Sequence, residues 1–190
     1  MVQVRRQSYL TAEGQVDLQR WLADLPLPVQ AQEADRLLAA CQLAQAVESA
    51  PGVDAGDWAR ESDCLTAGLD MAQILAELHV SHDCLVAAVL YRAVREQRLT
   101  LDVVAAQFGR EVAHVIEGVL RMAAIGELRR HRDGPVLGQA HAQKDNIRKM
   151  LIALVDDVRV ALIKLAERTC AIRAVKNDEQ RRQAVAQEVF

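Results

Sequence analysis

Aromatic residues are scarce in this chain of 190 residues, where phenylalanine, tryptophan and tyrosine together make up 3%. Strands draw on aromatic and β-branched residues that alternate with polar ones, and the sequence contains no convincing run of this kind. The apolar 51% is instead dominated by alanine, leucine and valine, which favour helices in the company of glutamate, glutamine and arginine. The composition therefore predicts an all-α fold, long enough to bury a core.

Other features that are missing narrow the class of protein. No apolar run reaches the roughly 18–20 residues of a membrane-spanning helix, and the amino terminus lacks the apolar stretch of a signal peptide. The formal net charge of −3 gives no basic signature for nucleic acid. The four cysteines are far apart and form no CxxC pair, which argues against a zinc ribbon or a redox dithiol (Cys41, Cys64, Cys84 and Cys170). We therefore expect a cytoplasmic domain with reduced thiols.

Apolar residues recur at helical spacing along most of the chain. Residues 1–32 are expected to form a leader, in which Trp21 and nearby leucines could dock on the body formed by residues 33–190. Body helices are predicted at 33–50, 57–80, 81–97, 100–108 and 111–130, followed by a loop around 133–138, two helices within 145–176, and a last helix from 178.

The longest periodic stretch, residues 145–176, contains two helices that meet at Asp156-Asp157, where the carboxylates suit a helix amino terminus. The first helix has an apolar face at i, i+3, i+4 and i+7 (Ile147, Met150, Leu151 and Leu154). The second is assigned a main stripe of Val158, Ala161, Leu162, Leu165, Thr169 and Ile172. Val160 and Ile163 lie off that stripe, so this helix is expected to be central in the domain.

Four segments carry a family resemblance. RKMLIALVDDVRVALIKLAER, at residues 148–168, resembles the end of the hydrolase domain in the RelA/SpoT family of alarmone (guanosine tetra- and pentaphosphate) synthetases and hydrolases. Three earlier segments are similar to upstream parts of that domain: AQILAEL at 72–78, LVAAVLYRAVRE at 85–96 and FGREVAHVIEGVLRM at 108–122. The resemblance implies an HD-domain-like multi-helix bundle.

The resemblance implies that active members hold a manganese ion with a His, a His-Asp doublet and a distant Asp. It also implies that a Glu-Asp pair acts on the attacking water. Matching the motifs puts the first His on Ala67, the doublet on Tyr91-Arg92, the distant Asp on Glu167 and the Glu-Asp pair on Arg95-Glu96. A substrate-contacting Asn falls on Ala171, and a basic substrate-binding loop falls around 58–60.

The charge of these positions argues against a metal. Two neutral His and two Asp carry about −2 towards a divalent ion, whereas the four residues found here sum to about zero and include a guanidinium that does not deprotonate. At about 4 Å and an effective dielectric constant of 20, each like charge costs about 4 kcal/mol. We therefore expect no metal, no cofactor and no hydrolysis, and we predict that Arg92 and Glu167 form a salt bridge where the ion would lie.

The resulting expectation is an inactive pseudo-hydrolase domain with a structural or regulatory role, from a longer GTP pyrophosphokinase truncated before its synthetase domain. The resemblance implies that such a parent transfers pyrophosphate from ATP to GDP or GTP in the stringent response. Its partners would be the adjacent synthetase domain and, through later regions, the ribosome and uncharged tRNA; membrane contact and direct nucleic-acid binding by this part are not expected.

Two alternatives stay open. One is a residual metal-dependent phosphohydrolase with shifted ligands (His79, His82, His114, Asp70 or Asp83). The other is a free-standing helical nucleotide-binding or interaction module.

Overall fold

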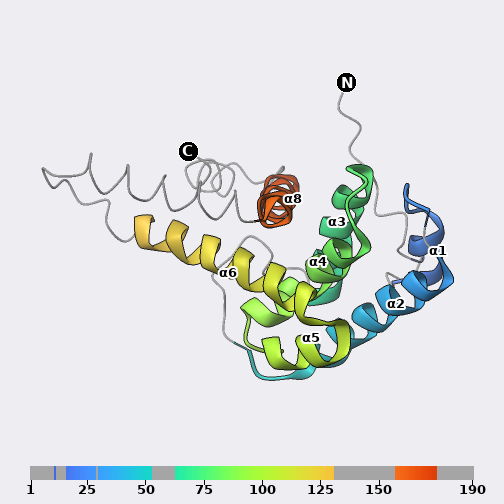
Figure 1. Cartoon of the computed structure of the whole chain (residues 1–190), viewed down its shortest axis with the longest axis horizontal. Coiled ribbons are helices and arrows are strands. Elements are labelled where there is room, and N and C mark those ends of the chain that lie inside the picture. The colour runs from blue at the N-terminus through green and yellow to red at the C-terminus, as the bar shows by residue number, and fades with distance from the viewer. Residues whose placement is uncertain (1–10, 12–15, 29, 53–62, 131–156, 175–190) are drawn as a thin grey trace, which may run out of the picture.

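The computed structural model describes residues 11, 16–28, 30–52, 63–130 and 157–174. These residues form seven α-helices and one short 3₁₀ helix, and the described ranges contain no strand, so the prediction of an all-α fold is confirmed (Figure 1). The elements are α1 (Leu18–Ala23), α2 (Ala31–Ala46), η1 (Val47–Ser49), α3 (Cys64–Glu77), α4 (His82–Arg95), α5 (Leu101–Phe108), α6 (Arg110–Arg130) and α8 (Val158–Ala174).

Most helix ends follow from local signals in the sequence. The hydroxyl of Thr100 accepts a hydrogen bond from the backbone N–H of Val103 and caps α5, which ends at Gly109, a residue with φ of 92° that suits glycine. Asp63 caps α3 in the same way through the N–H of Thr66. The predicted helix at 145–154, the loop at 133–138 and the last helix from 178 lie outside the described residues.

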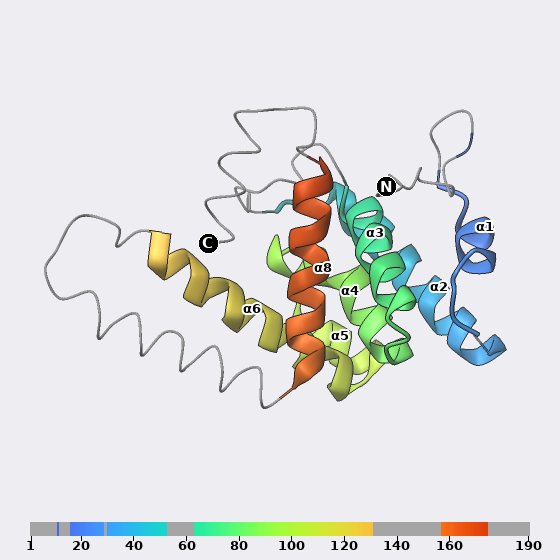
Figure 2. The same cartoon turned by 90° about the horizontal axis from the view of Figure 1, so that it is seen from above.

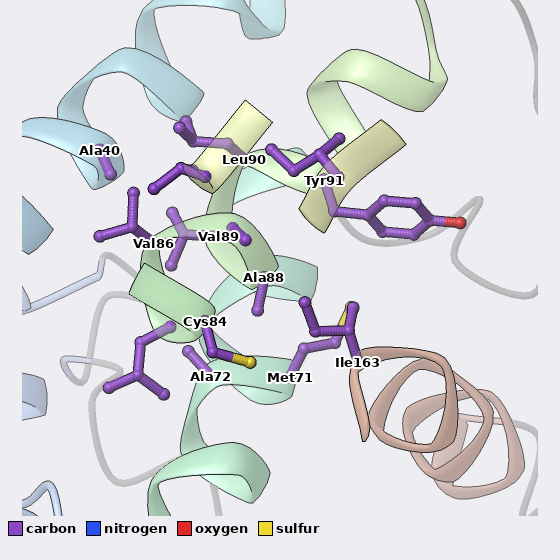
Figure 3. Close-up of a cluster of buried hydrophobic side chains, with 14 of the residues drawn as sticks. Ala40, Met71, Ala72, Cys84, Val86, Ala88, Val89, Leu90, Tyr91 and Ile163 are labelled. Carbon is purple, nitrogen blue, oxygen red and sulfur yellow. The ribbon is translucent and has the colours of Figure 1, made fainter. Parts of the chain in front are cut away.

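Helix α4 is the central element of the bundle. Ten of its 14 residues are buried, because α2, α3, α6 and α8 all pack against it. Figures 1 and 2 show it enclosed by these helices, with α8 crossing one side next to α3 and α6. The close-up in Figure 3 shows its side chains meeting Ala40 of α2, Met71 and Ala72 of α3, and Ile163 of α8.

Two glycines allow helices to approach closely. A Cβ atom at Gly68 of α3 would lie 2.6 Å from the carbonyl oxygen and 2.8 Å from the Cα of Val89, so the backbones of α3 and α4 are almost in contact. A Cβ at Gly118 of α6 would lie 2.6 Å from a methyl group of Val160 on α8. These contacts fix the helices that carry positions 67, 91 and 167.

The predicted apolar stripe of α8 was only partly right, since Ala161 is buried and Leu162 packs against the core partly buried. The buried face consists of Val160, Ala161, Ile163, Ala166, Glu167, Cys170 and Ala171, whereas Val158, Leu165 and Ile172 are 61%, 64% and 51% exposed. The helix has apolar residues on two sides, and its packing against α3, α4 and α6 selects the side with small residues, which allows close approach. The expected central position of this helix is not confirmed among the described residues, because α8 lies on one side of the bundle and α4 is the helix that the others enclose. The corrected orientation of α8 places Glu167 on its buried face.

The segment before α2 packs on the body as expected. Trp21 and Leu25 are buried in the core, and Leu22 and Leu27 pack against it partly buried. Within the described ranges no helix is both long and apolar enough to cross a membrane.

Candidate functional site

The structure brings together several of the positions at which the resemblance places catalytic and metal-binding groups. Tyr91 and Arg95, on the carboxyl-terminal half of α4, both reach Glu167 on α8: the Tyr91 hydroxyl donates to Oε1 of Glu167 at 3.4 Å and Nη1 of Arg95 donates to the same atom at 2.6 Å. Ala67 is buried on α3, which packs against both helices. Ala171, at the position of the substrate-contacting Asn, is also buried.

Glu167 is a buried carboxylate held by two cations. Its side chain is 4% exposed, and besides Arg95 it accepts a hydrogen bond from the ammonium group of Lys164, one turn earlier on α8. Burial lowers the pKa of Lys164, and the charge of Glu167 opposes that effect. Because both carboxylate oxygens already accept hydrogen bonds, Glu167 has little capacity left for a cation.

The predicted salt bridge between Arg92 and Glu167 is wrong. Nε of Arg92 instead donates to Oε1 of Glu96 at 2.6 Å, one turn further along α4, and Arg95 takes the place next to Glu167. Residues 92 and 95 are neighbours on the helix surface, so either could face α8. The local i, i+4 pair with Glu96 holds Arg92 on α4 and leaves Arg95 to bridge the two helices.

Glu96 is the second buried carboxylate. Arg92 binds one of its oxygens, and Nε of Arg98 donates to the other at 2.8 Å. Burial alone would raise the pKa of Glu96, but the hydrogen bonds and charges of Arg92 and Arg98 outweigh burial, so the pKa is lowered. The thiol of Cys64 also points at Oε2, at 3.6 Å, and burial together with the charge of Glu96 raises its pKa.

Arg98 joins this pair to the η1 turn. It donates to the carbonyl oxygen of Ala50 at 2.9 Å and to that of Glu48, while the carboxylate of Glu48 accepts from the backbone N–H of Cys64 at 2.8 Å. Sequence reasoning missed Arg98, Lys164 and Glu48. The only signal for the first two was their short spacing from Glu96 and Glu167, two and three residues away.

One donor in this region has no acceptor. Nη1 of Arg92 is buried and makes no hydrogen bond to the residues that the structure describes. Leaving such a donor unsatisfied costs about 1–3 kcal/mol.

The side chains of the shifted-ligand alternative are spread out or engaged elsewhere. His82 pairs with Glu33 through Nδ1 at 2.9 Å, and Asp83 pairs with Arg36. Both lie at the start of α4, about 15 Å along the helix from Arg92. In the described part of the chain, no group of three or more His, Cys, Asp or Glu side chains is placed to share an ion, and this search included the remaining candidates (Asp70, His79 and His114). The expected basic loop at 58–60 lies outside the described residues.

Comparison with known proteins shows a family model that matches this chain and several proteins that are similar to it in sequence. The HD domain family matches residues 40–190. A GTP pyrophosphokinase of Escherichia coli K12 is 33% identical over 172 residues, which are 90% of this chain and 22% of the relative. A GTP pyrophosphokinase of Photobacterium angustum is 41% identical over 126 residues, covering 65% of this chain and 16% of the relative.

The Escherichia coli bifunctional (p)ppGpp synthase/hydrolase SpoT is 35% identical over 121 residues, 62% of this chain and 16% of the relative. The chain thus spans 16–22% of the length of these three curated relatives.

Proposed function

The chain is an HD domain that belongs to the RelA/SpoT family, and we propose that it is a pseudo-hydrolase: a domain that keeps the helical bundle but has lost metal binding and hydrolysis. Its role is structural or regulatory, within a longer GTP pyrophosphokinase. That parent transfers pyrophosphate from ATP to the ribose 3′ position of GDP or GTP and acts in the stringent response. The relative that aligns with 90% of this chain carries the name GTP pyrophosphokinase, which favours this parent over a hydrolase.

The observation that carries the proposal is the pairing of Glu167 with Arg95 and Lys164. In the family pattern, position 167 supplies a metal ligand and position 95 supplies an acid. Here position 95 supplies a guanidinium, which lies 2.6 Å from the carboxylate oxygen. A cation built into the protein therefore neutralises the one acidic metal position that the sequence retains.

The residues present do not fit a divalent metal ion. Ala67 has no donor atom, and Arg92 is a permanent cation without a lone pair to offer. The Tyr91 hydroxyl hydrogen-bonds to Glu167. A site with this set of groups would repel a divalent ion, so it would offer no metal-bound water for hydrolysis.

As a domain without chemistry, the bundle would act on its neighbours by contact. We propose that its main partner is the adjacent synthetase domain of the same parent, and that other regions of the parent contact the ribosome and uncharged tRNA.

The test is an alarmone hydrolysis assay with added manganese. The purified chain should release no pyrophosphate from guanosine tetraphosphate above a no-protein control, while the bifunctional SpoT relative serves as the positive control. Turnover by this chain that a chelator abolishes would contradict the proposal. The His82→Ala variant would then show whether a shifted ligand set carries the activity, whereas binding of the alarmone without turnover would favour the nucleotide-binding module.

A further inference from the structure

Helix α8 has a second apolar stripe, which faces away from the bundle. Val158, Leu165 and Ile172 recur on it every seven residues and are more than half exposed. Leu162, which is partly buried, and Thr169 lie between them, so the spacing along the stripe alternates between four and three residues. This heptad repeat is the pattern by which one helix packs along another. We call these five residues the heptad stripe.

The heptad stripe concentrates apolar surface on one helix. Among the described residues, the exposed large apolar side chains are those of Val158, Leu165 and Ile172 together with two that lie on other elements (Leu78 and Val103). The hydroxyl of Thr169 donates to the carbonyl oxygen of Leu165 at 2.8 Å, so this polar group is satisfied within the helix. Apolar side chains that are scattered singly need no explanation, whereas contiguous ones mark an interaction surface.

The bundle presents the heptad stripe on a fixed support. The opposite side of α8 packs against α3, α4 and α6, and Arg95 of α4 pairs with Glu167 on that side. Figure 2 shows α8 in front of α4, with no labelled helix over the side that faces the viewer. A partner can therefore lie along the stripe without any rearrangement of the described helices.

Charge selects among the possible occupants. The positions that flank the heptad stripe hold alanine or arginine (Arg159, Ala161, Ala166, Arg168 and Arg173). The one acidic residue of α8, Glu167, is on the buried face. Of the neighbouring carboxylates, Asp157 and Glu111 pair with Arg159, and Asp70 acts on Cys170 of the buried face.

The sign of the flanks is therefore set in the carboxyl-terminal half of α8. Arg168 has further interactions within the protein, so the exposed Arg173 is the principal cation that α8 offers to a partner. Beside the stripe, α8 offers no acidic group of its own. A partner helix gains from acidic residues at its own flanking positions.

A second copy of this chain does not meet that requirement. In a parallel pair of α8 helices, Arg168 would lie opposite Arg173 of the second copy. In an antiparallel pair each flank meets the same flank, so arginine meets arginine or alanine. Neither arrangement supplies a carboxylate, and like charges along such a seam oppose pairing.

We propose that the heptad stripe is the docking surface for an amphipathic helix from outside residues 1–190, with apolar residues at heptad spacing and glutamate or aspartate beside them. The two helices would pack side by side, and the acidic flank of the partner would face Arg173. A lipid surface fits less well, because a helix that lies on a membrane buries a broad apolar face, whereas the exposed face here is a narrow seam.

The inference does not rest on the pseudo-hydrolase proposal, because the stripe lies on the side of α8 away from Glu167. A failed hydrolysis prediction is read by pyrophosphate release, and a failed docking prediction is read by peptide binding, so the two are distinguishable.

The test is fluorescence anisotropy of a labelled synthetic peptide of about three heptads, titrated with the purified chain at low salt. The peptide has leucine at the two apolar positions of each heptad and glutamate at the two flanking positions. It should bind saturably, and a peptide with lysine at the flanking positions should bind at least about tenfold more weakly. The absence of saturable binding of the glutamate peptide, or equal binding of both peptides, would overturn the proposal.

Variants of the chain locate the site. Leu165→Ser should weaken binding of the glutamate peptide by about tenfold or more, and Ile172→Ser serves if that variant does not fold. Leu78→Ser is the matched control, because Leu78 is an exposed leucine at the end of α3 and should leave binding unchanged. Arg173→Glu should weaken binding of the glutamate peptide and strengthen that of the lysine peptide.

Three outcomes would contradict the proposed occupant. The first is wild-type affinity for the glutamate peptide in a folded Leu165→Ser variant. The second is a chain that sediments as a dimer which Leu165→Ser dissociates, since the stripe would then hold a second copy. The third is binding of the chain to vesicles of anionic phospholipid that Leu165→Ser abolishes, since the stripe would then face a membrane.

Discussion

Removing the guanidinium of Arg95 tests the ion pair that joins α4 to α8. In Arg95→Met, Glu167 keeps Lys164 and the Tyr91 hydroxyl, but its carboxylate is 4% exposed and loses the guanidinium that α4 supplies. Breaking a buried ion pair from one side costs about 3–5 kcal/mol, and the remaining partners put this case at about 3 kcal/mol. For a chain of this size, that loss lowers Tm by about 6–12 °C.

The assay is chemical and thermal unfolding of the wild type, Arg95→Met, Glu167→Gln and the double variant. The double variant should be more stable than the sum of the single losses predicts, with a coupling energy of about 2 kcal/mol, because it removes both charges together. Arg36→Met removes an ion pair with Asp83, whose side chains are 38% and 32% exposed, and a hydrogen bond to the carbonyl oxygen of Phe108, so it should cost about 1–2 kcal/mol. An Arg95→Met loss no larger than that of the control, or additive losses, would refute the reasoning.

Three further predictions concern stability. Gly68→Ala should cost about 1–3 kcal/mol in a denaturant melt and more than Gly118→Ala, because a Cβ at position 68 meets backbone atoms of Val89 whereas one at position 118 meets a methyl group of Val160; equal losses would contradict this. Asp63→Ala should cost about 1 kcal/mol, whereas Ser81→Ala, whose side chain makes no cap bond, should cost little; the reverse order would refute the assignment of the caps. The folded-state pKa of Glu96 is lowered, so its stabilisation is present above the ordinary value of 4.5 and is lost as pH falls through the folded-state pKa; Glu96→Gln should flatten the acid limb of the stability curve, and an unchanged limb would contradict this.

The fold could be predicted from the sequence because its signals are local. Helical periodicity predicted a helix at 100–108, within one residue of the observed α5, and the four segments that resemble the RelA/SpoT family pointed to the family that the comparisons show. The buried face of α8 could not be predicted, since the helix is apolar on two sides. Its orientation depends on which side fits the grooves of α3, α4 and α6, and the small residues at 166 and 171 fit there better than the larger Leu165.

In the candidate site, too, the sequence predicted part of the arrangement and not the rest. The sequence identified which residues stand where the resemblance places metal ligands, and it predicted that a cation and a carboxylate would meet there. It could not decide which arginine would do so, because Arg92 and Arg95 share a face of α4 and the choice depends on the local pull of Glu96. The structure adds Arg98 and Lys164, whose role appears only once the two carboxylates are seen to be buried.

The most direct test of the proposed loss of metal binding is calorimetric titration of the purified, chelator-treated chain with Mn²⁺. A variant carries the ligands that the resemblance implies (Ala67→His, Tyr91→His, Arg92→Asp and Glu167→Asp, with Arg95→Glu to remove the competing cation) and is titrated alongside. We expect no saturable binding of Mn²⁺ to the wild-type chain. One equivalent of Mn²⁺ bound tightly by the wild-type chain would contradict the claim that built-in cations have replaced the metal.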